Sequence, residues 1–144
     1  MTLPELENLL AAGKLKREPA TQSELAGLLH SGEARLIDAR RLDLSLESRF
    51  DLVYNASHAL ALAALRWHGF RSDNRYVVFQ TLPHTLGLGP EVWRVLDKGH
   101  KLRNLSEYEG QLQIDERLLE DLIRAATLLR EAAVRLGPLS SAAI

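Results

Sequence analysis

The residues best suited to chemistry lie in one segment, from His100 to Tyr108. Arg103 carries a planar guanidinium, which can bind a phosphate through two parallel hydrogen bonds. His100 and Asn104 lie beside it on an expected helix, and Asn104 and Tyr108 are one turn apart. The segment would therefore present a polar ridge that could hold a nucleotide or bond to a neighbouring helix. Glu107 is one turn from Arg103, so an internal ion pair is the competing interpretation.

A second polar group lies in an otherwise apolar segment, where Tyr54 and His58 are one helical turn apart with Asn55 and Ser57 between them. A histidine in such a position is most often a hydrogen-bonded core residue. It becomes functional if His58 faces the ridge at Arg103 from the neighbouring helix. Spacing alone leaves both interpretations open.

The composition excludes several other classes of chemistry. The five histidines occur at none of the spacings typical of zinc ligands, so we expect no metal site and no cofactor. The absence of cysteine removes disulfides, thiolate ligands and a cysteine nucleophile. With 18 basic and 19 acidic residues, the net charge of −1 gives no long-range attraction for nucleic acid. Any RNA contact must therefore be local.

Helical signals recur along the chain and would position both polar groups. Thr21 and Glu24 form a capping-box pattern, in which each side chain can bond the backbone amide of the other, and this predicts a helix to about Arg41. Caps, stops and apolar spacing predict the other helices over residues 3–12, 45–68, 74–82, 90–108 and 116–136. Between the helices over 74–82 and 90–108 we expect irregular chain, and no alternating stretch is long enough to predict a strand.

The segment from Phe50 to Leu65 is apolar or small on nearly every face, so its helix should be central and buried on several sides. A homodimer interface would cover what the rest of a 144-residue chain leaves exposed. We therefore expect a single all-α domain over residues 1–144, a four-helix up-and-down bundle with short accessory helices, a core over about 21–136 and a flexible tail over 137–144. No apolar run reaches the ~20 residues that span a membrane, and no export signal is evident, so we expect a cytoplasmic protein.

Two segments resemble the HEPN family, small helical domains found in prokaryotic toxin pairs and beside nucleotidyltransferases. The run from Tyr54 to Gly69 looks like the family's second long helix, and Leu-Arg-Asn-Leu-Ser-Glu-Tyr over 102–108 looks like its motif helix. The likeness covers roughly residues 21–136. In active members an arginine, usually followed by a polar residue, precedes a histidine by four to six positions, and two such motifs meet across a dimer cleft and cleave RNA without metal. Arg103 and Asn104 match the beginning of that motif, but Tyr108 stands near its end and no histidine follows Arg103.

The resemblance implies an HEPN-type bundle that forms a homodimer, with an antitoxin or a nucleotidyltransferase as an expected partner. A phenol accepts protons poorly near neutral pH, whereas an imidazole accepts them well. We therefore expect a non-catalytic domain that binds a nucleotide, RNA or a protein partner through the region of Arg103. One alternative is a metal-independent ribonuclease of the toxin type, in which His58 or His100 replaces the missing base. Another is a structural partner of a nucleotidyltransferase, in which Arg103 and Glu107 form an internal pair.

Overall fold

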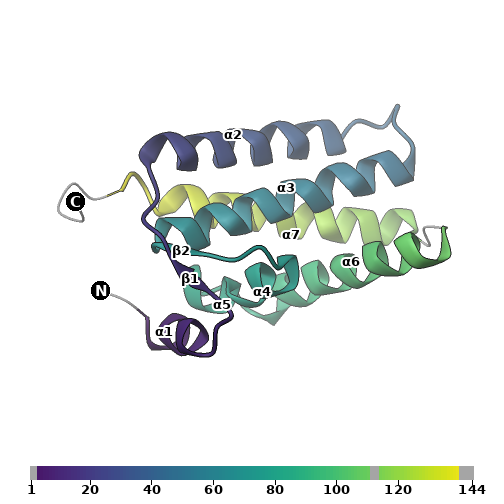
Figure 1. Cartoon of the computed structure of the whole chain (residues 1–144). Coiled ribbons are helices and arrows are strands. Elements are labelled where there is room, and N and C mark those ends of the chain that lie inside the picture. The colour runs from purple at the N-terminus through teal and green to yellow at the C-terminus, as the bar shows by residue number, and fades with distance from the viewer. Residues whose placement is uncertain (1–2, 111–113, 140–144) are drawn as a thin grey trace.

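The computed structural model describes residues 3–110 and 114–139, and 73% of these described residues are helical. Four long helices pack together and run in alternating directions (Figure 1): α2 (Gln22–Ala39), α3 (Leu46–Trp67), α6 (Pro90–Glu109) and α7 (Glu116–Arg135). The short helices α1 (Pro4–Ala11), α4 (Arg75–Gln80) and α5 (Leu82–Thr85) lie below α3 in the same view. The predicted helical bundle is confirmed at this level. In the described ranges no helix combines the length and apolar character that crossing a bilayer requires.

The helices begin where the local sequence predicts. The side chains of Thr21, Ser45, Asn74 and Asp115 each accept a hydrogen bond from the backbone amide three residues later. Each bond satisfies one of the amides that a first helical turn leaves without a partner. At the other end of α6, Gly110 has a φ of 70°, a left-handed conformation that glycine adopts without strain. The ends of α6 thus match the predicted range to within one residue.

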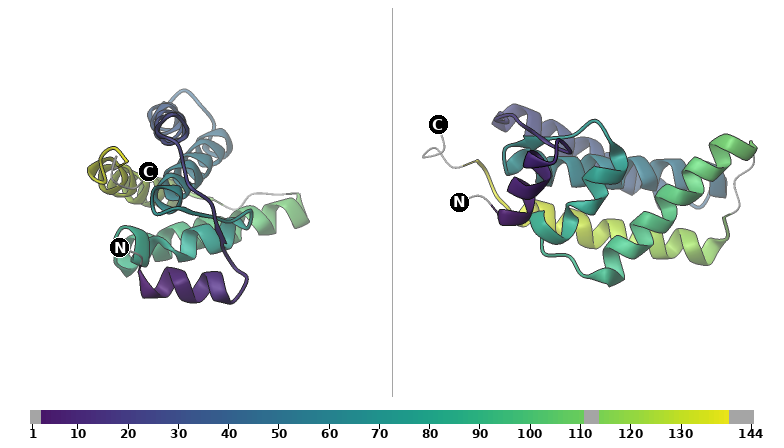
Figure 2. Two further views of the ribbon diagram at one scale, coloured as in Figure 1. Left: turned by 60° about the vertical axis from the view of Figure 1, so that its left-hand side comes forward. Right: turned by 60° about the horizontal axis from the view of Figure 1, so that its bottom comes forward.

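Helix α3 is central, as its composition predicts. Thirteen of its residues are buried, and α2, α7, α6, α4 and α5 all pack against it. Two further views show the other long helices gathered around α3, with α6 crossing them at an angle (Figure 2). Helix α2 lies close to α3 at Gly32, where an added Cβ would lie 2.6 Å from Leu60 Cγ. A glycine in mid-helix costs stability by itself, and here it permits tight helix packing.

Two short features differ from the prediction. Lys16–Arg17 (β1) and Phe70–Arg71 (β2) pair as an antiparallel sheet, although no strand was predicted. Two residues are too few to show an alternating pattern, so this sheet leaves no periodic signal in the sequence. The helix predicted over 74–82 ends earlier, at Gln80, and the following segment, predicted to be irregular, contains α5. Pro83 lies in the first turn of α5, where the fixed backbone angle of proline favours a helix.

Arg66, near the end of α3, holds the small sheet to the helices. Its side chain is 1% exposed, and its Nε lies 2.7 Å from Glu24 Oε2. Its terminal nitrogens donate hydrogen bonds to the carbonyl oxygens of Glu18, Pro19 and Phe70. A buried charge is tolerated only when it is paired and its donors are bonded, so these contacts fix the position of the sheet. The carboxylate of Glu24 is thereby engaged with Arg66, which explains why only the threonine half of the predicted capping box is observed.

Candidate functional site

The two polar groups expected from the sequence meet where α3 packs on α6. Tyr54 Oη lies 2.9 Å from His100 Nδ1, a buried hydrogen bond that joins the two helices. Asn104 Nδ2 lies 3.2 Å from the other ring nitrogen, His100 Nε2. The guanidinium of Arg103 lies over the Tyr54 ring, 4.9 Å from its centroid, which is a cation–π distance. Four of the predicted site residues therefore form one connected group.

A second guanidinium approaches the same ring. Arg75, the first residue of α4, lies 5.5 Å from the centroid of Tyr54, and its Nη1 donates to Asn55 Oδ1 at 3.1 Å. We call the Tyr54 ring with Arg75 and Arg103 the Tyr54 site. Within the described residues, Glu107 is the carboxylate in ion-pair range of either guanidinium, and it lies 3.1 Å from Arg103. The Tyr54 site thus holds two cations, and the carboxylate of Glu107 lies beside it.

The predicted ion pair between Arg103 and Glu107 is present, and it lies at the surface. The side chains are 30% and 61% exposed, respectively. An exposed pair of this kind contributes at most about 1 kcal/mol, because water and salt screen it and both side chains lose freedom. An incoming phosphate can therefore take the place of the glutamate at modest cost.

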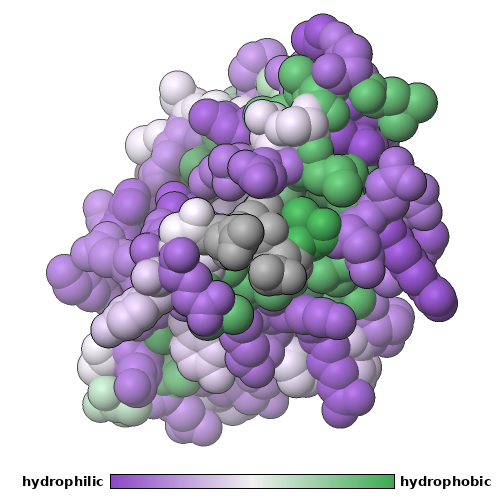
Figure 3. All heavy atoms as spheres, turned by 90° about the vertical axis from the view of Figure 1, so that its right-hand side faces the viewer, coloured by the Kyte–Doolittle hydropathy of each residue, from purple (hydrophilic) through white to green (hydrophobic). Residues whose placement is uncertain are grey.

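Tyr108 lies apart from the Tyr54 site. Its residue is 95% exposed, and α6 is helical through Glu109, so the side chain diverges from Arg103 as the spacing on an ideal helix predicts. Figure 3 faces the end of the molecule where α6 finishes and shows hydrophobic side chains within a mostly hydrophilic surface. Tyr108, although predicted as a ligand residue, is thus not brought into the group formed by Tyr54, His100, Arg103 and Asn104.

Burial and the nearby cations keep the two histidines uncharged at neutral pH. Burial lowers the pKa of His58 to about 4, and the charges of Arg75, Arg103 and His100 act in the same direction. Burial also lowers the pKa of His100, with Asp97 opposing and both arginines assisting. His58 therefore lies close enough to Arg75 and Arg103 for their charges to act on its pKa.

The geometry at these histidines favours binding over proton transfer. Both ring nitrogens of His100 are engaged, whichever way the Asn104 amide is turned. His58 with a pKa of about 4 is almost fully deprotonated near pH 7, so it is a poor general acid. What remains available to a ligand is a pair of guanidiniums, a group suited to phosphate and carboxylate.

Sequence reasoning missed the contribution of α4 to this region. Phe79 lies against the rings of Tyr54, His58 and His100, with centroids 5.9, 6.1 and 5.8 Å away. Tyr76 stacks on His100 at 6.1 Å. A partial signal was present, because Arg75, Tyr76 and Phe79 fall on one side of a helix that begins at the Asn74 cap. Nothing in that pattern says which helix this side faces.

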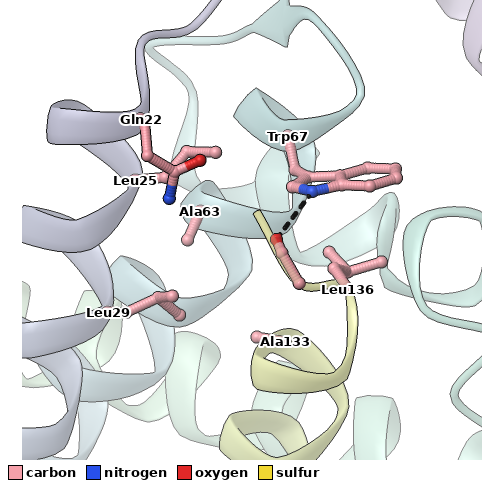
Figure 4. A pocket seen from close by; sticks show the side chains of 8 residues that line it. Gln22, Leu25, Leu29, Ala63, Trp67, Ala133 and Leu136 are labelled. Carbon is pink, nitrogen blue, oxygen red and sulfur yellow. Dashed lines mark hydrogen bonds between the residues drawn. The ribbon is translucent and has the colours of Figure 1, made fainter. Parts of the chain in front are cut away.

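A hollow at the C-terminal end of α3, away from the Tyr54 site, is small and mainly apolar (Figure 4). Its volume is about 20 Å³, and its lining residues are Gln22, Leu25, Leu29, Ala63, Trp67, Ala133, Leu136 and Gly137. Trp67 Nε1 donates to the Gly137 carbonyl at 3.1 Å, and the Leu139 amide donates to Gln22 Oε1 at 2.8 Å. The first residues of the predicted flexible tail are therefore held against α2 and α3. Residues 140–144 of that tail lie outside the described residues.

Over residues 3–110 and 114–139, no group of three or more histidine, aspartate or glutamate side chains is placed to hold a metal ion. Comparison of the chain with models of protein families, with curated proteins and with solved structures found no match. Because a helical bundle hosts many functions, the Tyr54 site must carry the inference.

Proposed function

We propose that this protein is a non-catalytic HEPN-like helical domain that binds a phosphate-bearing ligand, a nucleotide or an RNA segment, at the Tyr54 site. The observation that carries the proposal is the placement of two guanidiniums, Arg75 and Arg103, over one aromatic ring, with the exposed carboxylate of Glu107 beside Arg103. A chain of net charge −1 attracts nucleic acid only through such a local excess of positive charge.

The resemblance to HEPN domains supports the same surface. Arg103 and Asn104 match the beginning of the family motif, and the alternating long helices agree with an up-and-down bundle of that type. On this proposal the protein is a cytoplasmic homodimer, in which the second copy covers part of the surface near the motif helix. Size-exclusion chromatography with light scattering tests the oligomeric state, and a monomer at all concentrations contradicts it.

Binding without cleavage follows from the state of the histidines. A ribonuclease that acts without metal needs a proton acceptor and a proton donor beside the reacting phosphate. His100 is tied to Tyr54 and Asn104 through both nitrogens, and His58 is held neutral. Intact RNA after incubation with the purified chain in EDTA is therefore expected. Cleavage that disappears in Arg103→Ala would instead support the ribonuclease alternative.

The binding proposal is tested by fluorescence anisotropy with a labelled single-stranded RNA oligonucleotide at low salt. Arg103→Ala should weaken binding by about tenfold or more, since a hydrogen bond to a charged group contributes about 1.5–3 kcal/mol. Arg103→Lys should lie in between, because it keeps the charge and loses the two-pronged geometry.

Lys101→Ala is the matched control. It removes the same charge from the same helix, but Lys101 is largely exposed and pairs with Asp97 at 2.9 Å. Its affinity for the RNA should stay close to that of the wild type. Equal losses for Lys101→Ala and Arg103→Ala would mean that only diffuse charge matters, and an absence of RNA binding altogether would overturn the proposal.

A further inference from the structure

A hollow of about 190 Å³ lies between α4 and α6, lined by Tyr76, Phe79, Gln80, Trp93 and Asp97. It adjoins the Tyr54 site, because Tyr76 and Phe79 both lie against His100, whose Nδ1 is bonded to the Tyr54 hydroxyl. Pockets for drug-sized ligands measure about 300–1,000 Å³, so this hollow suits a single ring system.

The walls of the hollow offer flat aromatic surface from both helices. Tyr76 is 44% exposed although its ring is stacked on His100 with an interplanar angle of 27°, so much of the ring faces solvent. On the other side Trp93 is partly buried, and the guanidinium of Arg94 lies 5.7 Å from its ring centroid. Aromatic faces of this kind stack on planar heterocycles such as nucleobases.

The polar groups of the hollow add a preference among such rings. The Gln80 amide can both donate and accept hydrogen bonds, whereas the Asp97 carboxylate only accepts them. Asp97 is partly buried, and its partner Lys101 is largely exposed, so this pair is weak and leaves carboxylate oxygens available. A guanine presents two adjacent donors, N1–H and the N2 amino group, that match two carboxylate oxygens. An adenine presents only its N6 amino group as a donor on the corresponding edge.

We propose that the hollow between α4 and α6 is a base-binding subsite that takes the guanine of a guanosine nucleotide, with the phosphates of that nucleotide on Arg75 and Arg103. The inference rests on the proposed function, because it places the phosphates at the Tyr54 site. Arg75 directly precedes Tyr76 in α4, so neighbouring residues contact the phosphate and the base. The class of ligand is thereby narrowed to a guanosine nucleotide or a guanosine within RNA.

Isothermal titration of the full chain with GDP, ADP and pyrophosphate in EDTA tests the subsite. GDP should bind more tightly than ADP, and ADP more tightly than pyrophosphate, which lacks a base. Tyr76→Ala should weaken GDP binding by about 5- to 150-fold, the range expected for one lost stacking contact, and leave pyrophosphate binding unchanged. Tyr76→Phe keeps the ring and should keep GDP affinity, which separates the stacking surface from an effect on folding.

The role of Asp97 is tested by the ratio of GDP to ADP affinity. Asp97→Asn should reduce that ratio about fivefold or more, because the amide cannot accept both guanine donors. Asp121→Asn is the matched control, since Asp121 also pairs with a basic residue on its own helix, Arg124 at 3.0 Å. That variant should retain the wild-type ratio.

The two proposals fail in different ways. Equal affinity for GDP, ADP and pyrophosphate would overturn the base subsite while leaving phosphate binding intact. Tighter binding of ADP than of GDP would also overturn the guanine assignment. Failure of all three probes to bind would overturn the subsite together with the phosphate site on which it rests.

Discussion

Replacing His58 by leucine should remove much of the acid sensitivity of this fold. In the folded chain burial lowers the pKa of His58 to about 4, whereas the unfolded chain has the ordinary value of about 6.5. The unfolded state therefore takes up a proton first as the pH falls, and the free energy of unfolding decreases with it. The contribution of His58 is fully present above about pH 6.5 and is lost progressively down to about pH 4. The full difference corresponds to about 3 kcal/mol, of which about 2 kcal/mol is lost by about pH 5.

Urea unfolding followed by circular dichroism measures this effect at about pH 7.5 and about pH 5. Between these conditions the wild type should lose about 2 kcal/mol more stability than His58→Leu. Changes from the carboxylates and from His68 occur in both proteins, so they cancel in the comparison. His30 is exposed on α2, and His30→Gln should show the same acid sensitivity as the wild type. If His58→Leu lost as much stability as the wild type, His58 would not be held neutral by its surroundings.

Four further substitutions test the packing of the fold and of the site. Arg66→Leu should lower the free energy of unfolding by about 3–5 kcal/mol, because three carbonyl oxygens lose their donor and the Glu24 carboxylate keeps only its longer contact with Arg71. A loss below about 1 kcal/mol in urea would contradict that role. Gly32→Ala should cost about 1–3 kcal/mol, since its Cβ would meet a leucine of α3 at 2.6 Å. Gly27→Ala should stabilise the fold by up to about 1 kcal/mol, because the space around the new methyl group is open. If Gly27→Ala and Gly32→Ala shifted the melting temperature in the same direction, close packing of α2 on α3 would be contradicted. Tyr54→Phe should cost about 1–3 kcal/mol through the lost buried bond to His100 and leave RNA affinity nearly unchanged, because the ring beneath both guanidiniums remains. If removing that one hydroxyl lowered the RNA affinity, the ring alone would not position the two guanidiniums.

The helix boundaries were predictable from the sequence because their signals are local. A capping side chain such as Thr21, Ser45 or Asp115 acts on the amide three residues later, so the pattern and the structure it causes lie side by side in the chain. The burial of α3 was equally readable, because a helix that is apolar on nearly every face must be covered on several sides. The small sheet was not predictable, because its pairing depends on contacts made by Arg66 with distant carbonyl oxygens.

The candidate site was likewise predictable only where its signals are local. Arg103 and His100 could be assigned to one face of α6 by helical spacing, and Tyr54 and His58 to one side of α3. Only the structure shows that the two faces meet, because helical periodicity gives side-chain directions within one helix and not between two helices. Arg75 escaped notice for this reason, because its importance comes from where α4 packs and not from any spacing to Arg103.

The guanidiniums of Arg75 and Arg103 are proposed to bind an external anion together, and side-chain NMR measures this directly. Spectra of the arginine Nε–Hε groups are recorded while pyrophosphate is added to the full chain. We expect the Arg75 and Arg103 resonances to shift together with one dissociation constant, while Arg94, exposed on the same helix as Arg103, stays in place. Resonances of Arg75 and Arg103 that do not move, or that move no more than that of Arg94, would contradict anion binding at the Tyr54 site.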